Sequence, residues 1–171
     1  MSDPAVEFAR RVPLMRLGSD PFRQVIAADE AERAALARRF DLLSLDRLVA
    51  DVELVREPGG TILLSAAFEA DFAQECIVTL DPVAGSVAER FELRYGAPEA
   101  EDAAPAGDDN PAFEPLEGEA IDIGEAVAQE FSLALPLFPR APDALVEADP
   151  SEAPADGPFA TLARLGRGEP Q

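Results

Sequence analysis

The stretch TILLSAAFEADF, residues 61–72, alternates between apolar and more polar side chains at every second position. One face carries Ile62, Leu64, Ala66, Phe68, Ala70 and Phe72, and the other carries Thr61, Leu63, Ser65, Ala67, Glu69 and Asp71. A period of two is typical of a β-strand with one buried face. The stretch therefore predicts a long, half-buried strand around which a sheet can form.

The segment before this strand alternates in the same way. In LDRLVADVELVRE, residues 45–57, the side chains of Ala50, Val52 and Leu54 share one face, while Asp51 and Glu53 share the other. The PGG sequence at 58–60 then predicts a turn. The two segments together predict an antiparallel hairpin.

A second hairpin is expected after the long strand. Cys76, Val78 and Leu80 continue an apolar face, and DPVAG at 81–85 has the composition of a turn. Alternation then resumes through residues 86–95, where Glu89 interrupts the apolar face. Four successive strands without intervening helices indicate an antiparallel sheet, either open or barrel-like, rather than a βαβ fold.

Two helices are expected beside the sheet. DEAERAALARRF, residues 29–40, starts with Asp29 and has Glu32 three positions later, the arrangement of a capping box. A second capping pair, Asp122 and Glu125, starts a helix that should end at Leu135, because proline at the next position cannot continue it. The predicted fold is thus α+β, with an antiparallel sheet of hairpins and flanking helices at about 29–40 and 122–135.

The segments outside these elements divide the chain. Residues 1–140 are expected to form a single α+β domain that carries an acidic loop at 97–113. A proline- and acid-rich stretch at 141–157 reads as a flexible linker. PFATLARLG, residues 158–166, predicts a short C-terminal helical segment, which is too short to be stable by itself.

The composition excludes several kinds of function. The chain has no histidine and a single cysteine, so Cys-His and Ser-His-Asp nucleophiles cannot be built within it. No stretch of the N-terminus resembles a signal peptide, and no apolar run is long enough to span a membrane. These features predict a soluble, cytoplasmic protein.

The formal net charge is −20, and it is unevenly distributed. Residues 97–130 contain 11 acidic residues and no arginine, which is more than half of the net charge. Such a surface repels nucleic acid overall and favours a basic protein partner, although acidic residues that serve only solubility are the alternative. The candidate partner-binding residues are Asp102, Asp108, Asp109, Glu117 and Glu119.

Direct contact with RNA would need a local basic patch. The candidates are Arg33, Arg38 and Arg39 on the first helix, with Arg90 and Arg94 on a strand, provided that they converge in space. The alternative is that the helical arginines only complement the helix dipole near its C-terminal end.

Three stretches resemble a known family. QECIVTLDPVAGSVAERFELRYG (74–96), EPLEGEAIDIGEAVAQEFSLALPLFPRAP (114–142) and PFATLARL (158–165) are similar to the YceD family, the large ribosomal RNA subunit accumulation proteins of bacteria and plastids. The helix ADEAERAALARRF (28–40) resembles the alphaproteobacterial branch of that family. The motif residues are Cys76, Leu80, Pro82, Asp122, Leu135 and Pro136.

The resemblance implies a function in accumulating large-subunit ribosomal RNA, in subunit assembly, without enzymatic activity and without a cofactor. A basic ribosomal protein or assembly factor is then the expected partner, and ribosomal RNA is a second candidate. The competing hypothesis is a metal-dependent hydrolase or nuclease that uses paired carboxylates such as Asp122 and Glu125. Acidic residues are so abundant here that such pairs carry little weight.

The resemblance also bears on Cys76. Many members of the family carry C-x-R-C at the positions of Cys76 to Thr79, with another cysteine after the helix that ends in LALP, and these look like metal ligands. This chain has Thr79 at the second position and no further cysteine or histidine. Cys76 is therefore read as the remnant of a metal knuckle or as a buried apolar residue. A reactive thiol is disfavoured, because nothing near it in the sequence should lower its pKa.

Overall fold

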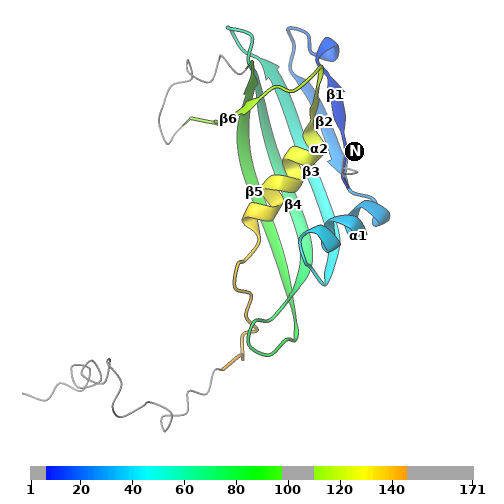
Figure 1. The fold of residues 1–171 in the computed structure, drawn as a ribbon, viewed down its shortest axis with the longest axis vertical. Helices are drawn as coiled ribbons and strands as arrows, with labels where there is room; N and C mark the ends of the chain where they lie inside the picture. The colour runs from blue at the N-terminus through cyan, green and yellow to red at the C-terminus, as the bar shows by residue number, and fades with distance from the viewer. Residues whose placement is uncertain (1–6, 98–109, 146–171) are drawn as a thin grey trace, which may run out of the picture. The chain divides into compact units, whose positions relative to one another are not determined.

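The computed structural model of the chain describes residues 7–97 and 110–145 (Figure 1). A five-stranded sheet has the order β2–β3–β4–β5–β6. Its strands are β2 (Phe22–Ala27), β3 (Ser44–Arg56), β4 (Ile62–Glu75), β5 (Pro82–Gly96) and β6 (Ala112–Pro115). The first four pair antiparallel, and β6 pairs parallel with the end of β5. The α+β prediction is confirmed, and the sheet is open rather than barrel-like.

A second, two-stranded sheet joins β1 (Arg11–Pro13) to β7 (Ala120–Asp122), and a short 3₁₀ helix, η1 (Leu14–Arg16), follows β1. The α-helices are α1 (Glu30–Arg39) and α2 (Ile123–Ala134). Figure 1 shows α2 crossing the face of the large sheet. No helix in the described part of the chain is long and apolar enough to cross a membrane.

One core lies between the helices and one face of the sheet. Every second residue of β4, from Ile62 to Phe72, is buried on this face, as the alternation predicts. Leu36 of α1 and Phe131 of α2 are fully buried in the same cluster. Phe131 contacts the rings of Phe68 and Phe72 edge to face, with centroids 6.4 and 5.7 Å apart. Both helices therefore cover the same face, and the opposite face is left without a covering layer among the described residues.

Both helix starts follow the predicted capping pattern. At α1, an Asp29 side-chain oxygen accepts a hydrogen bond from the Glu32 backbone N–H, and Glu32 accepts one from the Asp29 N–H, each 2.9 Å long. At α2, Asp122 Oδ1 accepts from the N–H groups of Gly124 and Glu125 at 3.2 Å. The helix ends at Ala134, before Leu135 and Pro136, so the predicted stop is confirmed to within one residue.

The predicted second hairpin is wrong in its details. Residues 76–80 are a turn rather than a strand, and β5 already begins at Pro82, so the expected turn at 81–85 is part of that strand. Gly85 pairs with Phe72, and a Cβ on Gly85 would lie 2.7 Å from the Phe72 ring. Glycine is thus required there by a close approach between strands, not by a turn. Three long strands, β3, β4 and β5, replace the four that were expected.

Sequence reasoning also missed β2, which pairs with β3 from Phe22 to Ala27. Its residues are an edge segment in which only Ile26 is buried. The chain up to Ala141 forms one compact unit, and only Pro142–Leu145 are described of the second unit.

Candidate interaction surface

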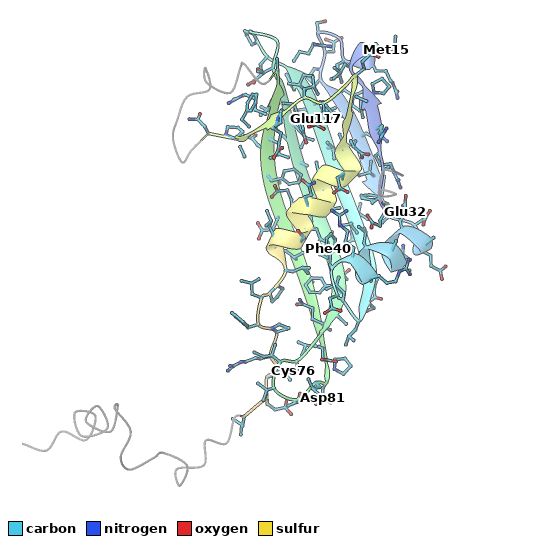
Figure 2. All side chains as sticks on the ribbon, viewed as in Figure 1. Met15, Glu32, Phe40, Cys76, Asp81 and Glu117 are labelled. Carbon is cyan, nitrogen blue, oxygen red and sulfur yellow. The ribbon has the colours of Figure 1, made fainter. Side chains whose placement is uncertain are left out.

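An acidic hollow of about 540 Å³ lies where β6, the loop to β7 and the first turns of α2 meet. We define it by its charged and aromatic lining, which is Arg11, Tyr95, Glu114, Glu117, Glu119, Asp122 and Glu125. Figure 2 labels Glu117 in the segment that leads from β6 towards α2. Five carboxylates thus face a single arginine in this hollow.

Two of these carboxylates are already engaged. Asp122 caps α2, accepts a further bond from the Arg10 N–H at 2.8 Å, and lies 3.7 Å from the Arg11 guanidinium. Glu125 accepts two hydrogen bonds from Arg39, at 2.7 and 2.9 Å. Both residues therefore have structural partners that hold the start of α2 in place.

The other three carboxylates, Glu114, Glu117 and Glu119, are exposed. None of them has a basic partner within the described ranges. Exposed like charges without cations produce a negative potential that attracts a cation. The hollow can therefore hold an ammonium or guanidinium group without first breaking an ion pair.

Two groups near the hollow have raised pKa values, mainly because they are buried and in smaller part because carboxylates lie nearby. Burial, together with the charges of Glu114, Asp122 and Glu130, raises the pKa of Tyr95 to about 12. Burial and the charge of Glu114 also raise the pKa of Glu130. Both shifts have the sign that uncompensated negative charge produces.

The predicted acidic residues fall into two groups. Glu117 and Glu119 both line the hollow. Asp102, Asp108 and Asp109 lie outside the described residues, so their part in the acidic surface stays a prediction.

The five arginines do not form one patch. Arg33, Arg38 and Arg39 belong to α1 on the helical side of the sheet, whereas Arg90 and Arg94 are on β5 and point to the opposite face, as their register with Ala67 and Leu63 shows. Arg39 is committed to Glu125 and Glu7, and Arg94 binds Glu57 at 2.7 Å. The sheet separates the two groups, so the condition of convergence on which RNA contact depended is not met.

Cys76 is the first residue of the turn at 76–80, at the end of the sheet that lies away from the hollow (Figure 2). The segment after α2 lies beside this turn. Its side chain is fully buried but is not part of the main apolar core. Its sulfur accepts hydrogen bonds from the N–H groups of Ala141 and Thr79, at 3.3 and 3.4 Å. The Ile77 N–H also donates to the Pro139 carbonyl at 3.0 Å. These hydrogen bonds surround the thiol with N–H donors. They also connect the segment after α2 to the turn at the end of β4.

These hydrogen bonds contradict the expectation that nothing near Cys76 would lower the pKa of its thiol. Hydrogen bonds from the Thr79 side chain and then from the Ala141 and Thr79 backbone lower the pKa of Cys76 to about 7. The largest cause, Thr79, is only three residues away, but its hydrogen bond depends on the shape of the turn, and the second donor, Ala141, is far away along the chain. Burial of Cys76 was expected, and the hydrogen bonds to its sulfur were not.

The other residues of the family motif shape the turn after β4 and the end of α2. Leu80 adopts a positive φ of 63° in the turn, and Pro82 opens β5. The carbonyl of Pro136 accepts a hydrogen bond from the Gln74 side chain at 3.1 Å, just after Leu135 at the end of α2. Together they fix the path of the chain around Cys76.

The carboxylate pair proposed for hydrolysis has other roles. Asp122 caps α2 and Glu125 binds Arg39, as described above. Within residues 7–97 and 110–145, no three Cys, Asp or Glu side chains gather in a way that could hold a metal ion. No observation favours the hydrolase hypothesis.

Three residues of the hollow, Arg11, Tyr95 and Glu114, were missed by sequence reasoning. Glu114 belongs to the acidic stretch at 97–130 and could have been found by extending the list of exposed acids. Tyr95 could not, because its position beside Glu114 depends on the parallel pairing of β5 with β6.

Comparison with known proteins gives one match. The family model described as "Large ribosomal RNA subunit accumulation protein YceD" matches residues 64–164, more than half of the chain. The matched region contains β5, the Cys76 turn, the acidic hollow's loop and α2. No curated protein and no solved structure matches the chain.

Proposed function

The chain belongs to the YceD family of large ribosomal RNA subunit accumulation proteins, and from this premise we propose that it is a non-enzymatic assembly factor that holds a basic protein partner on its acidic hollow. The partner is a basic ribosomal protein or assembly factor of the large subunit. The protein acts in the cytoplasm, where the large subunit is assembled.

The observation that carries the proposal is the set of three unpaired carboxylates, Glu114, Glu117 and Glu119, in a chain of net charge −20. Ribosomal proteins that bind RNA carry basic side chains, because backbone phosphates must be neutralised. An acidic hollow can bind the same side chains before RNA does. It would keep a basic partner from binding RNA non-specifically until assembly.

Charge steering gives the proposal a kinetic signature. Complementary charges accelerate association more than they strengthen the final complex, and salt screens them over about 8 Å at physiological ionic strength. Association with the partner should therefore slow markedly as salt is raised.

The test is a pulldown of the tagged full-length chain from its native cell, with and without ribonuclease. We expect basic large-subunit proteins or assembly factors to remain bound after ribonuclease treatment. Capture that disappears with ribonuclease would show RNA contact instead and would contradict the proposal.

A pair of matched variants makes the test specific to the hollow. The hollow variant carries Glu114→Gln, Glu117→Gln and Glu119→Gln, and the control variant carries Asp20→Asn, Glu30→Gln and Glu75→Gln at exposed sites elsewhere. Both remove three negative charges. Only the hollow variant should lose the ribonuclease-resistant partner. If both variants lost it equally, net charge and not the position of the carboxylates would explain binding.

A further inference from the structure

The outer edge of β5 lacks a neighbouring strand over most of its length. β5 pairs with β4 from Pro82 to Tyr95, but it pairs with β6 only from Leu93 to Gly96. Along Pro82–Glu92, no described segment pairs with the other side of the strand. In Figure 1 this part of β5 forms one margin of the sheet. An open edge offers a row of unpaired N–H and C=O groups to any extended segment.

The helix-bearing face of this edge is apolar and only partly covered. Val87 and Phe91 point towards the core, and both are half-buried at the margin of the cluster. Phe91 contacts the ring of Phe68, with centroids 6.2 Å apart. An additional strand beside β5 would cover the remaining apolar surface of Val87 and Phe91. The edge therefore offers apolar contacts as well as backbone pairing.

Acidic residues border the same face. Glu89, between Val87 and Phe91 in the alternation, is exposed on the helix-bearing face, as its pairing with Phe68 requires. Further along the strand, Glu114 and Glu130 lie close enough to Tyr95 to affect its titration. None of these three acids forms an ion pair with a described arginine. The edge thus combines strand pairing with negative charge.

We propose that the open edge of β5 receives an extended, basic segment of a protein partner as an additional strand, one of whose Lys or Arg side chains is bound by Glu89. The inference rests on the proposed function, because it states how the acidic surface would hold its basic partner. Backbone pairing supplies affinity without regard to sequence, and the charges select for a basic segment.

Charge decides against two other occupants. A second copy of the chain would bring another net charge of −20 to the edge. The residues that follow β5, 98–109, contain five acids and no basic residue, so this chain's own sequence there also adds negative charge. A basic segment is the occupant that relieves the repulsion.

The test uses a probe of defined chemistry with the full-length chain. The probe is a blocked peptide of alternating lysine and valine, compared with the same peptide N-methylated at every second residue. N-methylation removes the donors along one edge of the peptide and leaves its charge unchanged. We expect the unmodified peptide to slow amide hydrogen exchange within Pro82–Glu92 and the methylated peptide to have no such effect.

Two charge-reversal variants separate local recognition from general attraction. Glu89→Lys should weaken peptide binding about tenfold, because it places a like charge beside the peptide lysines. Glu30→Lys makes the same change in net charge on α1 and should weaken binding less than twofold. A melting temperature equal to that of the parent chain would show that Glu89→Lys is folded, and Glu89→Gln supplies a milder second variant, which should weaken binding in the same direction.

Each other outcome overturns the inference. Failure of the peptide to bind, equal binding of the methylated peptide, or protection located outside Pro82–Glu92 would exclude addition of a strand at this edge. Edge protection that appears without peptide and rises with protein concentration would identify a second copy as the occupant. If Glu89→Lys still captures ribonuclease-resistant basic proteins while the hollow variant does not, the proposed function stands and only the edge inference fails.

Discussion

At the scale of single residues, Gly124 decides how closely the N-terminal segment approaches α2. A Cβ at this position would lie 2.1 Å from the Phe8 carbonyl oxygen and 3.0 Å from the Arg10 nitrogen. The same approach lets the Ile123 N–H donate to the Arg10 carbonyl at 3.1 Å. Phe8 itself is fully buried in the core, so the segment has little freedom to move away.

We therefore predict that Gly124→Ala destabilises the protein by about 2 kcal/mol or more, because the added methyl group meets backbone atoms. Urea unfolding followed by circular dichroism measures the change. Gly18→Ala is the control, since nothing lies within 4 Å of a Cβ at that glycine. An equal effect of the two substitutions would show that the segment is not held against α2.

A second residue-scale prediction concerns the Cys76 thiol. Its pKa is lowered from 9.0 to about 7 by its hydrogen-bond donors, so the native state favours the thiolate. The resulting stabilisation is fully present above the unfolded value of 9.0 and is lost as the pH falls through about 7. The stability difference between the parent chain and Cys76→Ala should therefore increase from pH 6.5 to pH 9 in urea unfolding. A difference that stays constant across this range would mean that the donors do not favour the thiolate.

At the scale of elements, one ion pair ties the two helices together. Arg39, at the end of α1, donates to both oxygens of Glu125, in the first turn of α2. These hydrogen bonds, which Arg39 donates and Glu125 accepts, lower the pKa of Glu125 and raise the pKa of Arg39. The Phe40 and Phe131 rings, 5.8 Å apart, form the apolar contact beneath this ion pair.

Glu125→Gln should cost about 1 kcal/mol at pH 7, because the ion pair is only partly exposed. A lowered carboxylate pKa contributes stability above the unfolded value of about 4.5 and loses it as the pH falls through the folded value. The variant and the parent chain should therefore become equally stable near pH 3. Glu75→Gln, at an exposed glutamate, is the control, and a Glu125→Gln deficit that persists at pH 3 would contradict the ionic origin of the effect.

The elements also show what a sequence can predict. Alternation in 61–72 and the capping residues Asp29 and Asp122 located the central strand and both helix starts, because these signals are local. The boundary between β4 and β5 was misplaced, because Gly85 resembles a turn residue and its contact with Phe72 is known only from the register. The hydrogen bond from Ala141 to Cys76 joins segments that are far apart along the chain, and no local pattern reveals it. The same is true of the approach of Tyr95 to Glu114, which depends on the pairing of β5 with β6.

At the scale of the whole molecule, some charged side chains form ion pairs that hold the fold, and others have no ion-pair partner among the described residues. Half of the arginines in the described ranges form ion pairs, such as Arg10 with Glu32, Arg47 with Glu69 and Arg94 with Glu57. Glu114, Glu117 and Glu119 in the hollow and Glu89 at the β5 edge have no such partners in the part of the chain that the structure describes. Other described acids without an ion pair, such as Asp20, Asp51 and Glu75, lie elsewhere, so the proposal rests on how the carboxylates are grouped in the hollow and not on total charge.

The central claim is that the acidic hollow is needed for large-subunit assembly. The most direct measurement is the ratio of large- to small-subunit ribosomal RNA in native cells that lack the chain and express either the hollow variant or the control variant at equal levels. The account predicts that the control variant restores the ratio of the parent chain, whereas the hollow variant leaves it low. Full restoration by a folded hollow variant would contradict the account.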